Sequence, residues 1–218
     1  PYWALWELYR RFPCLHSFAA TPGVWQGAAT ADDGVGTWVA GSDGVVRLLG
    51  RTGDVIDSFR LDFPQARTLP IVAPTGDFVL LHDGARFTLW SRGGGLLAAL
   101  PVGTGTALNT AAFSRDGRRL AALVDGAAVV WSTRPFAELA RVTTDAAPLI
   151  ATTLSSDGHL LAARDRAGSL HLWDVQTKQR VTTFSRPVPA FATQRTYGDL
   201  LFSPDDRWLA DARVDTAG

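Results

Sequence analysis

Short apolar segments alternate with turn-forming residues along most of the chain. Residues 111–131, 152–173 and 200–218 share one order: an apolar segment ending in Phe or Leu, a Ser-x-Asp-Gly or Ser-Pro-Asp-Asp turn, a second segment and a second turn. In the first two stretches a third segment ends in Trp. Asp and Gly suit tight turns because Asp bonds nearby backbone amides and Gly adopts positive φ. Since no segment keeps the apolar period of a helix, the pattern predicts an all-β fold.

Two weaker copies of this pattern precede the three strong ones, at residues 28–49 and 71–90. The second turns of the five copies carry glycines spaced 40, 42, 42 and 50 residues apart, at Gly44, Gly84, Gly126, Gly168 and Gly218. A fourth short strand is expected at residues 55–61, 96–102, 139–143 and 181–184. A unit of about 42 residues with four short antiparallel strands is typical of one blade of a β-propeller.

The chain begins and ends inside a repeat. Trp6, counted onward from Gly218 through Pro1, falls six positions along, as Trp90 does after Gly84. Residues 1–18 are therefore expected to supply the third and fourth strands of a split blade. The sequence predicts a single propeller domain over residues 1–218, with blades at approximately 19–61, 68–102, 107–143, 147–184, and 198–218 plus 1–18.

Two arrangements of these five blade equivalents are open. In a closed five-bladed ring, Gly218 lies beside Pro1, and residues 3–8 pair antiparallel with residues 208–213, which removes the unpaired sheet edges. In the other arrangement, the blades form an arc of a larger, seven-bladed propeller. Consecutive blades keep the same register in both, so the sequence alone does not choose between them.

The repeats resemble the WD-repeat β-propeller family in its bacterial form. The resemblance is carried best by residues 113–131, 154–174 and 202–210, although the Trp-Asp dipeptide occurs once, at Trp173 and Asp174. It implies an interaction or sensing module within a larger multidomain protein. Propellers of this type are often joined to a signalling kinase, a nucleotide-hydrolysing switch or a protease-like effector.

Blades of this family usually contain a relay of hydrogen bonds that starts at a Gly-His pair in the loop entering the blade. This sequence departs from the family because no blade has that Gly-His pair. We expect the second-turn aspartates to bond the amides of their own turns: Asp43, Asp83, Asp125, Asp165 and Asp215. Without the relay, stability must depend more on apolar packing between blades, and a modest stability is expected.

The composition of the chain indicates its cellular compartment and excludes some classes of partner. Twenty-one basic residues balance twenty-one acidic ones, so no net charge draws the chain to nucleic acid. No apolar run approaches the roughly twenty residues of a membrane-spanning helix. Cys14 is the single cysteine, which excludes an internal disulfide and favours a reducing, cytoplasmic location. The sequence contains no Met, even at position 1, so we expect a piece of a longer protein.

One insertion marks a candidate contact site. The step from Leu154 to Phe202 is about seven residues longer than the step from Phe113 to Leu154, and the extra residues fall in the loop 185–198. Arginines, aromatic residues and prolines of this loop are candidates for binding a protein partner or sister domain: Arg186, Pro187, Pro189, Phe191, Arg195 and Tyr197. His82 is a further candidate because it precedes a second turn on the same face. Alternatively, the loop only covers an irregular blade junction or packs on a neighbouring domain.

Candidate chemistry is sparse. The histidines occupy unrelated repeat positions, so no pair has metal-ligand spacing. First-turn aspartates such as Asp116 and Asp157 are interpreted as turn residues rather than calcium ligands. No catalytic residue, metal or cofactor is expected, and the favoured function is a non-catalytic interaction or sensing scaffold. The alternatives are an enzymatic propeller, lactonase-like or peptidase-associated, and a purely structural propeller that orders neighbouring domains.

Overall fold

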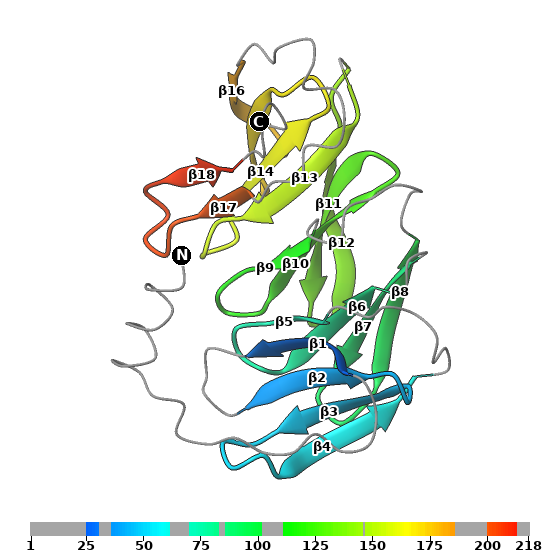
Figure 1. Ribbon diagram of the computed structural model, residues 1–218. Helices are drawn as coiled ribbons and strands as arrows, with labels where there is room; N and C mark the ends of the chain where they lie inside the picture. The colour runs from blue at the N-terminus through cyan, green and yellow to red at the C-terminus, as the bar shows by residue number, and fades with distance from the viewer. Residues whose placement is uncertain are drawn as a thin grey trace, which may run out of the picture.

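The fold is all-β, as the sequence predicts. The computed structural model describes residues 25–30, 36–61, 70–82, 86–101, 111–145, 147–185 and 200–212. These residues form strands and turns, and none of them lies in a helix. Four antiparallel sheets have four strands each, and a fifth sheet has two described strands (Figure 1). The prediction of four-stranded antiparallel blades is confirmed.

The strands of each sheet follow one another in chain order. The first sheet contains β1 (Trp25–Thr30), β2 (Thr37–Gly41), β3 (Val45–Leu49) and β4 (Val55–Arg60). The second contains β5 (Pro70–Val72), β6 (Phe78–His82), β7 (Arg86–Ser91) and β8 (Leu96–Pro101). The third contains β9 (Ala111–Phe113), β10 (Arg119–Val124), β11 (Ala127–Thr133) and β12 (Phe136–Val142). The fourth contains β13 (Leu149–Leu154), β14 (Leu160–Asp165), β15 (Leu170–Asp174) and β16 (Arg180–Phe184), and the fifth contains β17 (Leu200–Phe202) and β18 (Leu209–Asp211).

Strand β12 begins earlier than the sequence predicts. It was expected at residues 139–143, but Phe136 already pairs with Thr133 across the two-residue turn of Arg134 and Pro135. Because this turn has only two residues, Thr133 and Phe136 on either side of it pair directly with each other. The other three fourth strands begin within one residue of the expected positions.

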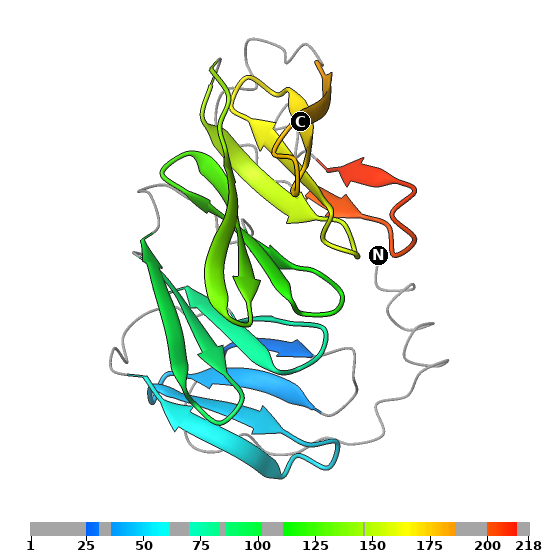
Figure 2. The same cartoon turned by 180° about the vertical axis from the view of Figure 1, so that it is seen from behind.

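The sheets follow one another around an arc (Figures 1 and 2). The first strands of successive sheets lie beside one another on the inner side, β1 next to β5, β5 next to β9, and β9 next to β13. The fourth strands lie on the outside. The described sheets do not close into a ring, because the first and fifth sheets lie at the two ends of the arc. Pro1, Gly218 and residues 3–8, on which the closed arrangement depends, lie outside the described residues.

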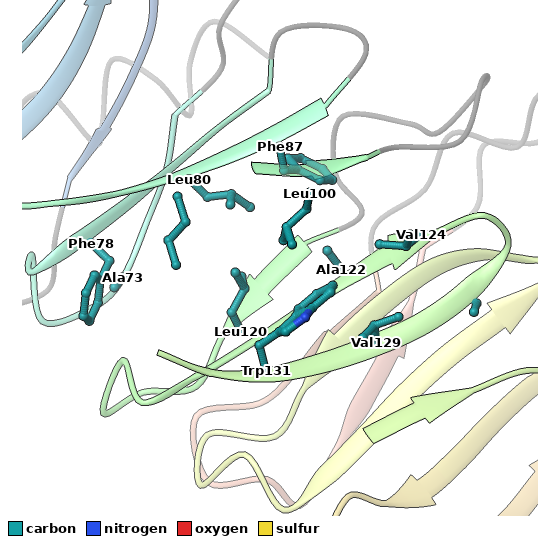
Figure 3. Packing of buried hydrophobic residues seen from close by; sticks show 12 residues of the cluster. Ala73, Phe78, Leu80, Phe87, Leu100, Leu120, Ala122, Val124, Val129 and Trp131 are labelled. Atoms are coloured by element: carbon teal, nitrogen blue, oxygen red, sulfur yellow. The ribbon is translucent and has the colours of Figure 1, made fainter. Parts of the chain in front are cut away.

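Apolar clusters between consecutive sheets form the core. The cluster between the second and third sheets joins Phe87 and Leu100 to Leu120, Val129 and Trp131 (Figure 3). Equivalent clusters lie at the other junctions. Removing a Leu or Phe side chain from water contributes about 1.5 to 3 kcal/mol. Each pair of consecutive sheets therefore has its own apolar cluster, and these separate clusters hold the arc together.

Candidate functional site

The sequence-predicted contact residues lie largely outside the part of the chain that the structure describes. This holds for the six residues of the loop 185–198, namely Arg186, Pro187, Pro189, Phe191, Arg195 and Tyr197. The backbone of His82 ends strand β6, where it pairs with Phe87, but its side chain is outside the described set. The contact role of these residues stays a prediction.

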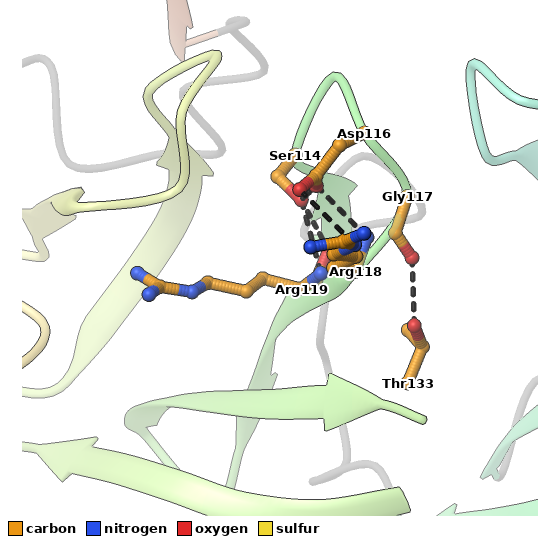
Figure 4. A network of polar contacts seen from close by, with 6 residues as sticks. All are labelled: Ser114, Asp116, Gly117, Arg118, Arg119 and Thr133. Carbon is orange, nitrogen blue, oxygen red and sulfur yellow. Dashed lines mark hydrogen bonds and ion pairs between the residues drawn. The ribbon is translucent and has the colours of Figure 1, made fainter. Parts of the chain in front are cut away.

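The first turns of the sheets are locked by a repeated set of hydrogen bonds. In the fourth sheet the Ser155 hydroxyl donates to Asp157 Oδ1 at 2.6 Å and accepts from the Leu160 amide at 2.9 Å. Asp157 Oδ1 also accepts from the His159 amide at 2.9 Å. The turns that begin at Ser114 and Ser203 make the same three bonds (Figure 4). The interpretation of these aspartates as turn residues is confirmed.

These bonds also keep the turn carboxylates ionised. The Ser155 hydroxyl, followed by the His159 amide, lowers the pKa of Asp157 below its ordinary value. The Ser203 hydroxyl does the same for the pKa of Asp205. A carboxylate held in this way is a poor proton donor near neutral pH, because donation requires a raised pKa. The first turns are therefore suited to presenting fixed charge.

Neighbouring first turns are bonded to one another. The Arg115 amide of the third sheet donates to the Ser156 carbonyl of the fourth at 2.8 Å. The Ser156 amide in turn donates to Asp206 Oδ1 of the fifth sheet at 2.6 Å. The Arg119 guanidinium adds a bond to the Gly158 carbonyl at 2.6 Å. Residues 115–118, 156–159 and 204–207 thus form one connected surface, which we call the first-turn surface.

Charged side chains of both signs point outward from the first-turn surface. The Arg118 side chain is 84% exposed beside Asp116, which is 53% exposed. His159 and Asp157 form a similar exposed pair, with 3.4 Å between Nδ1 and Oδ2. Exposed ion pairs add little stability, so these side chains remain available to a partner. The arrangement suits recognition of a polar protein surface.

The second sheet lacks this turn chemistry. Ala73 stands where the first turns of the third, fourth and fifth sheets have Ser, and Thr75 where they have Asp. The buried Thr75 hydroxyl has no hydrogen-bond partner among the described residues. A Cβ on Gly117 would lie 2.7 Å from this hydroxyl, so the first turns of the second and third sheets are in close contact. The first-turn surface therefore covers the third to fifth sheets.

A buried polar network in the fourth sheet escaped sequence reasoning. His171 Nε2 lies 3.0 Å from Asp165 Oδ2, and His171 Nδ1 lies 3.0 Å from the Thr183 hydroxyl. His171 is 4% exposed, and its ring contacts Trp173 at 5.4 Å. The available signal was a His two residues before the repeat Trp, in a sheet whose preceding turn contains Asp. The sequence pattern favoured His82 over His171 as a candidate site residue.

This network joins three elements of a single sheet. Asp165 ends β14, His171 lies in β15 and Thr183 lies in β16, and the second oxygen of Asp165 accepts from the Ser169 amide at 2.8 Å. Carboxylate, imidazole and hydroxyl follow the order used by hydrolytic triads. Here the groups hold β16 against β15 and fix the second turn. The first sheet has a simpler version, in which Asp43 pairs with Arg47 at 2.5 Å.

Two second-turn aspartates, Asp43 and Asp165, bond amides of their own turns as expected. Asp43 Oδ1 accepts from the Val45 amide at 3.0 Å, and Asp165 Oδ1 accepts from the Ser169 amide at 2.8 Å. The hydrogen bond from the Arg47 guanidinium is the largest cause that lowers the pKa of Asp43, and the bond from the Val45 amide lowers this pKa to a smaller extent. For Asp125 the structure gives a left-handed turn conformation, with φ of 51°, and its expected bond to a turn amide is not formed among the described residues. Asp83 and Asp215 lie outside the described residues.

No group of three or more His, Cys, Asp or Glu residues in the described ranges could hold a metal ion. The same ranges contain no helix that is long and apolar enough to cross a membrane.

None of the models of known protein families matches the chain, and no curated protein matches it either.

Proposed function

We propose that the chain is a WD-repeat propeller module of a larger bacterial protein. In this proposal it works in the cytoplasm as a non-catalytic scaffold that binds a protein partner or a sister domain in signalling. Recognition is carried by turn and loop side chains, without bond chemistry. The fold supports a propeller, and the sequence motifs support the family resemblance.

The observation that carries the proposal is the bonded first-turn surface. Hydrogen bonds from Arg115 to Ser156 and from Ser156 to Asp206 fix three consecutive turns before any partner arrives. A surface ordered in advance loses less conformational entropy on binding. Its mixed charges favour a protein partner over nucleic acid, which requires an excess of positive charge.

A charge-reversal experiment tests the proposal. The full polypeptide that contains this chain is used as bait in its source cells, with Arg118→Glu and Arg207→Glu combined in one variant. Both side chains are exposed on the first-turn surface. We expect a saturable protein partner whose recovery falls about tenfold in this variant, because rim charges control specificity and association rate. Arg60→Glu is the matched control. Arg60 is exposed and pairs with Val45 beside the second turn of the first sheet, away from the first-turn surface, so this substitution should leave recovery unchanged.

A fourth bait lacks residues 187–196. Loss of the partner from this bait alone assigns binding to the loop that the sequence predicts, which keeps the scaffold function and removes the first-turn surface. If the intact bait retains no saturable protein partner, the proposed function is wrong.

A further inference from the structure

Asp-Gly dipeptides occur in four described turns of the molecule: Asp43-Gly44, Asp116-Gly117, Asp125-Gly126 and Asp157-Gly158. The dipeptides at residues 33–34 and 83–84 lie outside the described residues. An Asp that precedes Gly can isomerise without an enzyme, because the Gly backbone nitrogen attacks the Asp carboxyl and no Gly side chain hinders its approach. In a folded protein the rate depends on how firmly the carboxyl and the backbone N–H are held.

The first turns hold both of these groups in hydrogen bonds. Asp157 Oδ1 accepts from the Ser155 hydroxyl at 2.6 Å and from the His159 amide at 2.9 Å. The Gly158 amide donates to the Ser155 carbonyl at 2.8 Å. The turn that begins at Ser114 makes the equivalent bonds, and Figure 4 shows how its carboxylate is held. Attack within these two turns therefore requires three hydrogen bonds to break first.

The second turn of the first sheet is held by a different set of bonds. Asp43 Oδ1 accepts from the Val45 amide at 3.0 Å and from the Arg47 guanidinium at 3.2 Å. The Gly44 amide donates to the Gly41 carbonyl at 3.1 Å. The Arg47 bond is also the largest cause that lowers the pKa of Asp43. A carboxyl that stays ionised reacts slowly, because the neutral form is the one that loses water during ring closure.

The second turn of the third sheet lacks all of these bonds. Asp125 and Gly126 alone join β10 to β11, since Val124 pairs with Ala127. Both turn residues have positive φ, 51° and 77°, as in a type I′ hairpin. In the described part of the chain, no residue donates a hydrogen bond to the exposed Asp125 carboxylate, and the Gly126 amide has no acceptor. The next amide, that of Ala127, already belongs to the strand pair.

The charged neighbour of Asp125 is held by another residue. The Arg141 guanidinium donates to Glu138 Oε1 at 3.2 Å and to Glu138 Oε2 at 2.9 Å. Glu138 is accordingly the largest cause that raises the pKa of Arg141, and the charge of Asp125 adds a smaller part. Arg141 therefore does not fix the Asp125 carboxyl, which can rotate toward the Gly126 nitrogen.

We propose that Asp125 is a site of spontaneous isomerisation to isoaspartate in the folded protein and reacts faster than the other described Asp-Gly dipeptides. The Gly126 nitrogen forms a bond to the side-chain carboxyl carbon, and the carboxyl hydroxyl leaves with the amide proton as water. Water then adds to the ring carbonyl that came from the main chain, and the bond from that carbon to the nitrogen breaks. The backbone afterwards runs through the side-chain carbon. The proposal goes beyond the scaffold function, since the reaction needs no partner.

The modification would act on the junction between the third and fourth sheets. The Gly126 carbonyl accepts from the Leu149 amide at 3.0 Å, and a Cβ on Gly126 would lie 3.1 Å from Pro148 Cβ. Isoaspartate adds one carbon to the backbone of a two-residue turn. We therefore expect it to disturb both the hairpin and its bond to the fourth sheet.

Ageing of the full chain tests the proposal. Folded protein is kept at neutral pH for several weeks and digested, and isoaspartate in its peptides is methylated by an isoaspartyl methyltransferase with labelled S-adenosylmethionine. Each hydrogen bond that must break first slows the reaction by about fivefold. We expect at least about tenfold more label on Asp125 than on Asp43, Asp116 or Asp157. The control is the same chain in urea, where the four dipeptides should isomerise at similar rates.

One variant tests protection by the turn bonds. Ser155→Ala removes the hydroxyl bond to Asp157 and should raise the label on Asp157 by about fivefold while the label on Asp125 is unchanged. No increase at Asp157 contradicts the protection on which the proposal rests. In the folded wild-type chain, label on Asp125 that does not exceed the label on the other three residues overturns the proposal. Absence of label on Asp125 while the urea sample is converted also overturns it.

Discussion

Individual buried polar groups are satisfied unevenly along the repeat. In the fourth sheet the His171 ring uses both nitrogens, one toward Asp165 and one toward Thr183. In the junction between the first and second sheets, the indole N–H groups of Trp38 and Trp90 are buried without a hydrogen-bond partner in the described part of the chain. A buried unpaired donor costs about 1 to 3 kcal/mol. Polar pairing therefore stabilises the fourth sheet more than the first junction.

Removing the Thr183 hydroxyl should weaken the fourth sheet. Thr183→Val keeps the shape and the strand preference of the side chain but leaves His171 Nδ1 without its partner at 3.0 Å. We expect the free energy of unfolding to fall by about 1 kcal/mol. Urea denaturation followed by tryptophan fluorescence measures the change.

The neighbouring residue supplies the control for this prediction. Thr182 is half-buried and pairs with Leu172, so its side chain lies on the other face of β16. Thr182→Val should change the free energy of unfolding by less than about 0.5 kcal/mol. A loss of the same size in both variants would show that the His171 contact is not the cause.

At the residue scale, sequence reasoning succeeded where the bonds are local. Asp157 was interpreted as a turn residue because Asp bonds an amide two positions ahead, as it does with His159. His171 was not recognised because its partners lie six and twelve residues away. They come together only through the pairing of β15 with β14 and β16, and no local pattern records that pairing.

At the scale of strands and sheets, fourth strands add side chains to the apolar clusters between sheets. The Phe59 ring of β4 stacks on the Trp90 ring of the second sheet, and its centroid lies 6.0 Å from the centroid of the Trp38 ring. The strand pattern predicted where β4 runs, since alternation of apolar residues depends on the strand itself. It did not predict that Phe59 reaches the next sheet, because that contact depends on how two sheets are placed in the arc.

Truncating Phe59 should loosen the junction between the first and second sheets. Phe59→Ala removes a half-buried ring from the stack with Trp90, and we expect a loss of about 2 kcal/mol in the free energy of unfolding. Val55→Ala, in the same strand at a side chain 51% exposed, is the control and should cost less than about 0.5 kcal/mol. Thermal and urea unfolding measure both. Equal losses would mean that β4 contributes through its own sheet alone.

At the scale of the molecule, ionised turn aspartates are spread along the whole arc. Asp43, Asp157 and Asp205 come from the first, fourth and fifth sheets, and hydrogen bonds lower the pKa of each carboxyl below its ordinary 3.8. The largest cause is Arg47 for Asp43, Ser155 for Asp157 and Ser203 for Asp205. Because the sheets are joined in series, weakening several turns at once affects the entire arc.

Acid should therefore destabilise the protein through its turns. A carboxyl whose pKa is lower in the folded state stabilises the fold above its unfolded pKa and loses that contribution as the pH falls through the folded pKa. We expect the free energy of unfolding that these groups contribute to be constant above about pH 5 and to fall as the pH drops below about 4. Urea titrations at a series of pH values from about 5 down to about 2 measure the slope.

The serines provide a direct control for the acid transition. The double variant Ser155→Ala/Ser203→Ala removes both hydroxyls, which should return the pKa of Asp157 and of Asp205 toward the ordinary value. The free energy of unfolding should then start lower but fall less steeply as the pH drops. Ser156→Ala, whose hydroxyl makes a 3.3 Å bond to the Pro204 carbonyl and no bond to a turn carboxylate, should keep the slope of the wild-type chain. An unchanged slope in the double variant would assign the acid transition to other carboxyl groups, and the hydroxyl bonds would then hold the turns without setting their response to pH.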